Sequence, residues 1–128
     1  TTEIYTLSLH DALPICASEA VLVNTAGELC EGTGSNVFLI DDQGIVTPPL
    51  RSGCLAGITR ALVLEWFDAT ERDLTAGDLE RASEVFLTSS TRNVHPVARV
   101  DARVVGATEV GAALAEQFWQ RALDEPDP

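Results

Sequence analysis

Short apolar runs separated by turn-forming residues dominate the first two thirds of the chain. Runs bounded by glycine, asparagine, aspartate or proline are typical of β-strands joined by tight turns. Strands are therefore expected at residues 19–24, 28–31, 36–40, 45–47, 70–74, 84–88, 94–100 and 102–105. The turn residues Thr25, Ala26 and Gly27 would join the first two strands into a hairpin.

Apolar residues at helical spacing mark three other segments. Between residues 58 and 67, Ile58, Leu62 and Trp66 recur every four positions, which places them on one face of an amphipathic helix. Similar patterns predict helices at 76–82 and 110–123. Because strands and helices mix without strict β–α–β alternation, the sequence predicts an α+β fold.

The start of the chain has a different character. Residues 1–15 resemble, in codon order, the translation of a short-read sequencing adapter. We therefore expect this stretch to be a scar of sequence assembly, and we leave His10 and Asp11 out of the candidate sites. The native domain is expected to cover residues 16–124, followed by a short acidic tail at 125–128.

Composition is typical of a globular protein. The 128 residues suffice for one domain with its own core, and 45% of them are hydrophobic. The formal net charge of −12 would repel a phosphate backbone, and the arginines are scattered, so we expect no nucleic-acid partner. No apolar run approaches the roughly 20 residues that span a bilayer, and no secretory signal is recognisable. We therefore expect a cytoplasmic protein without a membrane anchor.

Residue types that bind metals are too dispersed for a metal site, and we expect none. Cys16, Cys30 and Cys54 lie far apart, with no histidine at ligand spacing. This favours reduced, half-buried thiols over a disulfide framework or a zinc site. His95 lies beside Pro96 in an expected strand, so we interpret it as a structural or rim residue.

Three stretches interrupt the apolar pattern and carry the candidate chemistry. They are ELCEGTGSNVF (28–38), TPPLRSGCLAGITR (47–60) and EVFLTSSTRNVHPV (84–97). In the first, Gly32 and Gly34 allow the backbone to approach a flat ring or to turn sharply. In the second, Gly57 precedes the expected helix, where unpaired N–H groups and the helix dipole favour an anion. The third contains a cluster of hydroxyl side chains.

Together, these stretches resemble the class IV aminotransferases, the fold-type IV enzymes that use pyridoxal 5'-phosphate. The resemblance in order and spacing runs from about residue 19 to residue 105 and covers the family's C-terminal cofactor-binding domain. The family includes branched-chain and D-amino-acid aminotransferases and 4-amino-4-deoxychorismate lyase. The resemblance implies a role in amino-acid metabolism, a small amino-acid or 2-oxo-acid substrate, and a homodimeric parent protein.

The resemblance also implies a cofactor role for six residues. A pyridoxal ring is a better electron sink when its ring nitrogen is protonated, and Glu31 stands where the family has the carboxylate for that purpose. Leu55 would pack against the face of the ring. The remaining residues would hold the phosphate: Gly57, Ile58, Thr59 and Ser90.

Thr91 and Arg92 would, by the same resemblance, face the carboxylate of the substrate. No catalytic residue is assigned, because the family's Schiff-base lysine is absent: all eight basic residues are arginine. The family places this lysine a few tens of residues before the position of Glu31. We therefore expect the parent protein to be an enzyme and this lysine-free chain to be an inactive fragment.

Several hypotheses about function stay open at this point. Within the family, an aminotransferase would exchange amino groups between amino acids and 2-oxo acids, whereas the lyase would release pyruvate and form 4-aminobenzoate for folate synthesis. The stretch from Thr91 to Asn93 departs from the branched-chain pattern. Outside catalysis, the chain would be a non-catalytic fragment that binds a phosphate-bearing ligand, or an acidic interaction domain that keeps the motifs as inherited scaffold.

Overall fold

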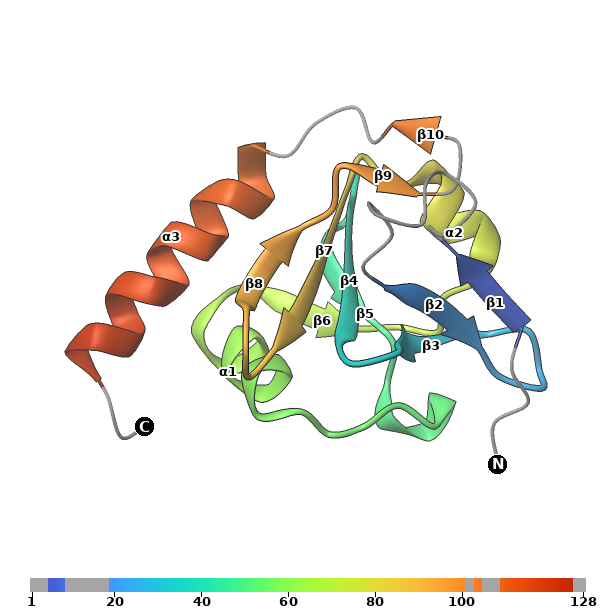
Figure 1. Ribbon diagram of the computed structural model, residues 1–128, viewed down its shortest axis with the longest axis horizontal. Helices are drawn as coiled ribbons and strands as arrows, with labels where there is room; N and C mark the ends of the chain where they lie inside the picture. Colours follow the sequence, from blue (N-terminus) through green and yellow to red (C-terminus); the bar gives the residue numbers. More distant parts are fainter. Residues whose placement is uncertain (1–4, 9–18, 101–102, 105–108, 126–128) are drawn as a thin grey trace.

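The computed structural model describes residues 5–8, 19–100, 103–104 and 109–125, and it has the expected α+β architecture (Figure 1). The strands are β1 (Tyr5–Ser8), β2 (Ala20–Val23), β3 (Leu29–Gly32), β4 (Asn36–Asp41), β5 (Gly44–Thr47), β6 (Ala69–Glu71), β7 (Glu84–Ser89), β8 (Asn93–Pro96), β9 (Arg99–Val100) and β10 (Arg103–Val104). The helices are the 3-10 turn η1 (Leu50–Ser52), α1 (Ile58–Trp66), α2 (Ala76–Arg81) and α3 (Glu109–Asp124).

Five of the ten described strands form one central sheet. Its order is β6-β5-β4-β7-β8, and all neighbours in it are antiparallel except β5 and β6, which are parallel. A second sheet has the order β1-β2-β3, and β9 pairs with β10. The hairpin expected from the turn at Gly27 is formed by β2 and β3.

The two middle strands of the central sheet are apolar on both faces. In β4, Val37 and Leu39 join one buried cluster, whereas Phe38 and Ile40 join the other. In β7, Phe86 stacks on Phe38 with a distance of 4.9 Å between ring centroids. Successive side chains of a strand point to opposite faces, so a continuous apolar run requires cover on both. The sheet is therefore the middle layer of the domain.

Different elements cover these two faces. Residues from β2, β3 and α2 complete the first cluster, and residues from α1 and α3 complete the second. Figure 1 shows α3 lying along β8 at one side of the sheet, with α1 below. Buried Glu84 fixes the start of α3, because its carboxylate accepts from the backbone N–H groups of Val110 (3.1 Å) and Gly111 (2.9 Å).

The segment between β5 and α1 is anchored by buried polar contacts. The Nδ2 group of Asn24 donates to the carbonyl oxygen of Ser52 at 3.0 Å. The buried thiols of Cys30 and Cys54 lie 3.6 Å from the carbonyl oxygens of Ser52 and Pro49. These contacts fix the path of residues 48–57 and hence the place where α1 begins. Cys16 lies outside the described residues.

The elements differ from the sequence prediction mainly near the chain's C-terminal third. The strand expected at 94–100 is broken, since β8 ends at Pro96 and a bend at Ala98 separates it from β9. The strand expected at 70–74 is the shorter β6. Of the strand expected at 102–105, only the part in β10 is described.

Within the stretch 1–15, the described residues of β1 pair antiparallel with β2. Nothing in this pairing identifies the origin of the stretch, so its assignment as a scar stays a prediction.

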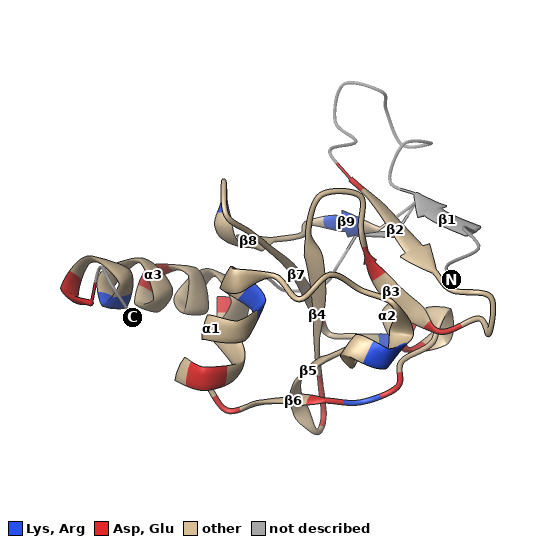
Figure 2. Ribbon diagram, turned by 90° about the horizontal axis from the view of Figure 1, so that it is seen from below, with Lys and Arg blue, Asp and Glu red and all other residues tan. Residues whose placement is uncertain are grey.

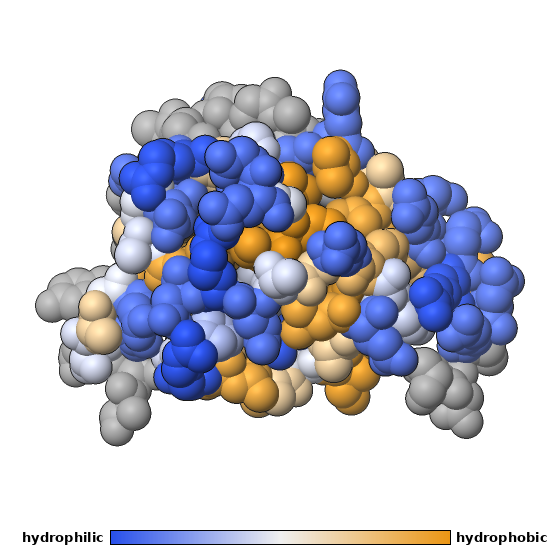
Figure 3. Space-filling view, turned by 180° about the vertical axis from the view of Figure 1, so that it is seen from behind, coloured by the Kyte–Doolittle hydropathy of each residue, from blue (hydrophilic) through white to orange (hydrophobic). Residues whose placement is uncertain are grey.

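The surface of the described residues is mixed. Figure 2 shows acidic and basic residues scattered over loops and helices, and Figure 3 shows apolar side chains gathered in the middle of one face. The large apolar side chains that are exposed in the described part are Leu50, Leu55, Ile58, Val110, Trp119 and Leu123. No helix in the described ranges is long and apolar enough to cross a membrane.

Candidate functional site

Four chain segments end or begin at one edge of the molecule. β3 ends at Gly32, β4 begins at Asn36, β7 ends at Ser89, and α1 begins at Ile58. Because β4 and β7 are antiparallel, with Asn36 opposite Thr88, the start of one strand and the end of the other lie side by side. Residues far apart in sequence therefore meet at this edge.

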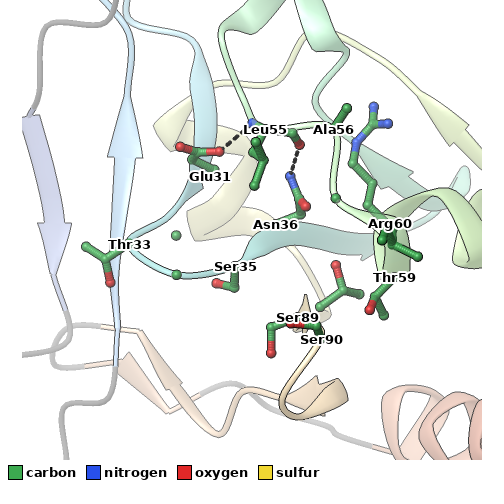
Figure 4. A pocket seen from close by; sticks show the side chains of 15 residues that line it. Glu31, Thr33, Ser35, Asn36, Leu55, Ala56, Thr59, Arg60, Ser89 and Ser90 are labelled. Atoms are coloured by element: carbon green, nitrogen blue, oxygen red, sulfur yellow. Dashed lines mark hydrogen bonds between the residues drawn. The ribbon is translucent and has the colours of Figure 1, made fainter.

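A cavity of about 440 Å³ opens between these segments. It is lined by residues 31–36, 55–60 and 88–90. In Figure 4, Glu31 and Leu55 lie towards one side of the cavity and Thr59, Ser89 and Ser90 towards the other. Its size falls within the range of about 300–1,000 Å³ that is typical of small-molecule sites.

Glu31 is held in place by the loop that precedes α1. Its Oε1 atom accepts a hydrogen bond of 2.6 Å from the backbone N–H of Leu55 (Figure 4). Glu31 lies opposite Leu22 in the β2–β3 ladder, so the strand fixes its backbone as well. One carboxylate oxygen is thus used for positioning, while the carboxylate as a whole borders the cavity.

Asn36 also holds the loop that precedes α1. Its side chain is buried, and its Nδ2 group donates to the carbonyl oxygen of Leu55 at 2.8 Å. Its Oδ1 atom lies only 2.4 Å from where a Cβ would stand on Gly57. Glycine is therefore favoured at position 57 by the close approach of this amide and not by the backbone, whose angles (φ −67°, ψ 146°) suit any residue.

The start of α1 is left uncapped. No side chain caps this helix, and its first turn contains no acidic residue. The first N–H groups of a helix have no intrahelical partner and carry a partial positive charge. Thr59 is buried at this helix start, whereas Ile58 exposes 77% of its surface and Leu55 exposes 73%. Backbone donors, a hydroxyl and apolar side chains thus border the same space.

Two buried hydroxyls of the cavity wall lack a hydrogen-bond partner among the described residues. They are the Oγ atom of Ser35 and the Oγ1 atom of Thr88, which is 1% exposed. Buried polar groups are nearly always satisfied in folded proteins, so an orphaned pair points to a ligand or to ordered water. Sequence reasoning missed both residues, although the strand register of Thr88 opposite Asn36 directs it to this face.

The predicted cofactor residues all line the cavity, but the predicted substrate residues do not. The former are Glu31, Leu55, Gly57, Ile58, Thr59 and Ser90. Thr91 and Arg92 lie at the exposed tip between β7 and β8, next to the lining residues Ser89 and Ser90. The convergence expected from the sequence is present, and the role of each residue stays a prediction.

Arg92 is held at this tip by a buried carboxylate that sequence reasoning did not single out. Its Nη2 atom lies 3.4 Å from Oε1 of Glu19, whose side chain is only 4% exposed. Its backbone N–H donates to the hydroxyl of Ser89 at 3.1 Å. A lone glutamate before a strand gives no sequence signal of such a contact.

His95 is a neighbour of the site and does not line it. It lies in β8 opposite Leu87. Burial, and to a lesser extent the positive charge of Arg92, lowers the pKa of His95, although Glu19 acts in the opposite direction. The imidazole is therefore neutral over a wider pH range than usual, as suits the structural role expected for it. Within the described ranges, no cluster of three metal-binding side chains occurs.

The geometry can now be compared with known proteins. The family model of amino-transferase class IV matches residues 5–100. The chain belongs to this family. The match includes all three stretches that suggested it and begins at residue 5, within the stretch assigned to a scar.

Individual relatives agree with this assignment. The branched-chain-amino-acid aminotransferase of Pseudomonas aeruginosa is 36% identical over 110 residues, which are 82% of this chain and 36% of that protein. The crystal structure of the branched-chain aminotransferase from Thermoproteus uzoniensis with norvaline has a TM-score of 0.81 at 28% identity, covering 88% of this chain and 39% of that one. The crystal structure of the T.th. branched-chain amino acid aminotransferase with pyridoxamine 5'-phosphate has a TM-score of 0.75 at 31% identity, covering 84% and 38%.

These matches cover only part of the relatives. The chain spans 36–38% of the length of three curated branched-chain aminotransferase relatives that it matches. Pyridoxal phosphate is the cofactor of class IV aminotransferases, and the cavity fits such a group. It offers a carboxylate, exposed apolar side chains, an uncapped helix start and two hydroxyls without partners among the described residues.

Proposed function

We propose that this chain forms the pyridoxal-phosphate-binding part of an amino-acid aminotransferase. One observation carries the proposal: Glu31 and the uncapped start of α1 border the same cavity, whose wall contains buried hydroxyls without partners in the described part of the chain. A ligand that satisfies both ends needs a basic nitrogen at one end and an anion at the other. Pyridoxal phosphate combines the two on a flat ring.

At the ring end, Glu31 would face the pyridine nitrogen and keep it protonated. The hydrogen bond from Leu55 leaves the second carboxylate oxygen, Oε2, available for this contact. The exposed side chain of Leu55 would lose contact with water by packing on the ring. When bound, pyridoxal phosphate supplies the electron sink for breaking bonds at the α-carbon of an amino acid.

At the phosphate end, the backbone N–H groups of Ile58 and Thr59 would bind the anion. Helix starts of this kind bind phosphate because free N–H groups and the dipole act together. The hydroxyls of Thr59 and Ser90 would donate further hydrogen bonds. Gly57 allows this helix start to sit close to Asn36, which fixes its position relative to Glu31.

At the substrate end, Thr91 and Arg92 would bind the carboxylate of an amino acid or a 2-oxo acid. Thr91 and Arg92 follow directly in the sequence after Ser89 and Ser90, which line the cavity. The chain itself contains no lysine amine that could bond to the cofactor. Turnover would therefore require an amine from outside this sequence, as in a longer, homodimeric parent protein, and the chain alone would be inactive.

Binding of pyridoxamine 5'-phosphate tests this proposal directly. This probe has no aldehyde, so it reports only the non-covalent contacts, and its fluorescence or its heat of binding can be followed. Binding to the wild-type chain is expected, and Thr59→Val or Glu31→Gln is expected to weaken it by about tenfold. Glu80→Gln on α2 removes an exposed carboxylate away from the cavity and is the matched control.

The proposal fails if the wild-type chain does not bind the probe, or if both variants bind it as well as the control does. The reaction type needs a second experiment, in which the chain follows the lysine-bearing region of a class IV aminotransferase. Transfer of an amino group from an amino acid to a 2-oxo acid is then expected. Release of 4-aminobenzoate from aminodeoxychorismate in its place would assign the lyase reaction.

A further inference from the structure

Glu19 is a buried carboxylate that contacts residues of the cavity wall but does not itself line the cavity. It is 7% exposed and immediately precedes β2. Its Oε2 atom accepts from the hydroxyl of Thr33 at 2.7 Å and from the backbone N–H of Gly34 at 3.1 Å. It also packs closely on this loop, since a Cβ on Gly32 would lie 3.1 Å from the same oxygen.

The other oxygen of this carboxylate serves a different segment. Oε1 of Glu19 accepts from Nη2 of Arg92 at 3.4 Å, and these residues are 73 positions apart in the sequence. Arg92 in turn donates its backbone N–H to the hydroxyl of Ser89. The carboxylate thus reaches the tip between β7 and β8 directly beside the lining residues Ser89 and Ser90.

The two segments that Glu19 joins both border the cavity and continue from neighbouring strand ends, because Asn36 at the start of β4 lies opposite Thr88 near the end of β7. We call residues 32–35 the loop wall and residues 89–92, of which only Ser89 and Ser90 line the cavity, the hairpin wall. The loop wall follows Glu31, whereas the hairpin wall contains Ser90. A ligand that contacts Glu31 at one end and Ser90 at the other must meet both walls at their correct separation. Each wall continues from its own strand, and Glu19 is a side chain that binds both.

We propose that Glu19 is a positioning residue, which sets the separation of the loop wall and the hairpin wall and orients Arg92 towards the carboxylate of the substrate. This inference rests on the proposed function, because the ligand that spans the walls is pyridoxal phosphate with its substrate. Glu19 contacts neither of them. It acts through Thr33, Gly34 and Arg92.

Because Oε2 of Glu19 binds the loop wall and Oε1 binds the hairpin wall, different substitutions can remove the two sets of contacts separately. In Glu19→Gln, the amide oxygen can keep the bonds from the loop wall, but the NH₂ group then faces the guanidinium of Arg92, donor against donor. This variant releases the hairpin wall alone. Glu19→Ala releases both walls. Arg92→Gln removes the same ion pair at its half-exposed partner and leaves the buried side chains unchanged.

Affinity for pyridoxamine 5'-phosphate is the first readout. Glu19→Gln and Arg92→Gln are each expected to weaken binding by about threefold, as for a partly exposed ion pair, and the double variant no further. Glu19→Ala is expected to weaken it by about tenfold. Inorganic phosphate would contact only the hairpin wall and the start of α1 and would bind more weakly, so its affinity should change by less than about twofold. A general loss of structure would weaken both ligands alike.

Backbone amide resonances of the ligand-free chain are the second readout. Glu19→Gln should shift the amides of Ser90 to Asn93 more than those of Thr33 and Gly34, which keep an acceptor, whereas Glu19→Ala should shift both sets strongly. Glu80→Ala, which removes the same charge from an exposed position on α2, should shift neither. If Glu19→Ala does not fold, the Glu19→Gln and Arg92→Gln pair still decides the question.

The outcomes separate the two proposals. Absence of any probe binding by the wild-type chain overturns the proposed function, and the amide shifts then still test the link between the walls. Binding by the wild-type chain that Glu19→Ala leaves intact overturns the role of Glu19 alone. Equal losses of affinity for the probe and for inorganic phosphate also overturn it, because they indicate general damage and not a change in wall separation.

Discussion

An alanine at position 57 provides a sharp test of how the loop before α1 is held. The backbone angles of Gly57 (φ −67°, ψ 146°) are open to any residue, so the substitution introduces no backbone strain. The new Cβ, however, would lie 2.4 Å from Oδ1 and 3.6 Å from Cγ of Asn36. Because Asn36 is buried, its amide must rotate or retreat, which breaks its 2.8 Å hydrogen bond to the carbonyl oxygen of Leu55.

The magnitude follows from two opposing contributions. Losing the hydrogen bond of Asn36 costs about 1 kcal/mol, and up to about 3 kcal/mol if the buried amide finds no other partner. Alanine also restricts the unfolded chain, which stabilises the fold by about 0.4–1 kcal/mol. The free energy of unfolding of Gly57→Ala should therefore be lower than that of the wild type, by up to about 2.5 kcal/mol. Phosphate binding should weaken as well, because the same shift displaces the start of α1.

Urea unfolding of four chains measures this effect and its cause. The set is the wild type, Gly57→Ala, Asn36→Ala and the double variant. In the Asn36→Ala background the clashing amide is gone, so alanine at position 57 should be neutral or stabilise by about 0.4–1 kcal/mol. An equal loss in both backgrounds would refute the clash with Asn36. A Gly57→Ala chain more stable than the wild type would refute it too.

Three other perturbations have defined outcomes. Glu84→Gln keeps one acceptor for the start of α3 but loses the charge and one bond, and it should lower the free energy of unfolding by about 2 kcal/mol in urea titrations. Thr75→Ala removes the capping box that Thr75 forms with Asp78 at the start of α2 and should cost about 1 kcal/mol. Since the pKa of His95 is lowered in the fold, the unfolded chain binds the proton more readily, and stability should fall as the pH drops below about 6.5. His95→Gln should remove this part of the pH dependence.

The predictions for Glu84 and His95 each have their own control. Glu116→Gln changes an exposed glutamate inside α3 that contacts only Gln120 among the described residues, and it should leave stability almost unchanged. A loss equal to that of Glu84→Gln would mean that position 84 acts through overall charge. For His95, a difference between wild type and variant that stays constant from pH 8 to pH 5, a range of about three units around the usual histidine pKa, would contradict the stated shift.

Strand positions were predictable where burial imposes a simple pattern. The apolar runs around Phe38 and Phe86 identified β4 and β7, since strands covered on both faces carry apolar residues continuously. β6 was misplaced because its residues, Ala69 to Glu71, have neither apolar alternation nor a turn signal, and only its parallel pairing with β5 makes it a strand. The break lies at the bend at Ala98, after Val97 has still donated its N–H to the carbonyl oxygen of Val85, and no local pattern reveals this bend.

The candidate site was predictable to the extent that its residues form motifs. Glu31, Thr59 and Ser90 each stand in a recognisable stretch, and the structure brings them to one cavity. Thr88 and Glu19 were missed for different reasons. The partner of Thr88 across the sheet is known only once β4 and β7 are in register, whereas Glu19 gains its importance from a contact 73 residues away.

The two buried thiols beside residues 48–57 can serve as probes of local opening, through their rate of alkylation. Cys30 and Cys54 are 1% and 8% exposed, so an alkylating reagent reaches them only when this segment lifts away from its carbonyl contacts. Under such conditions the labelling rate reports the free energy of local opening, separately from global unfolding. With Cys16 replaced by serine, the rate at Cys54 would follow the opening of the loop that carries Leu55 and Gly57. A ligand held by that loop would slow the reaction in proportion to its occupancy, without contacting either sulfur.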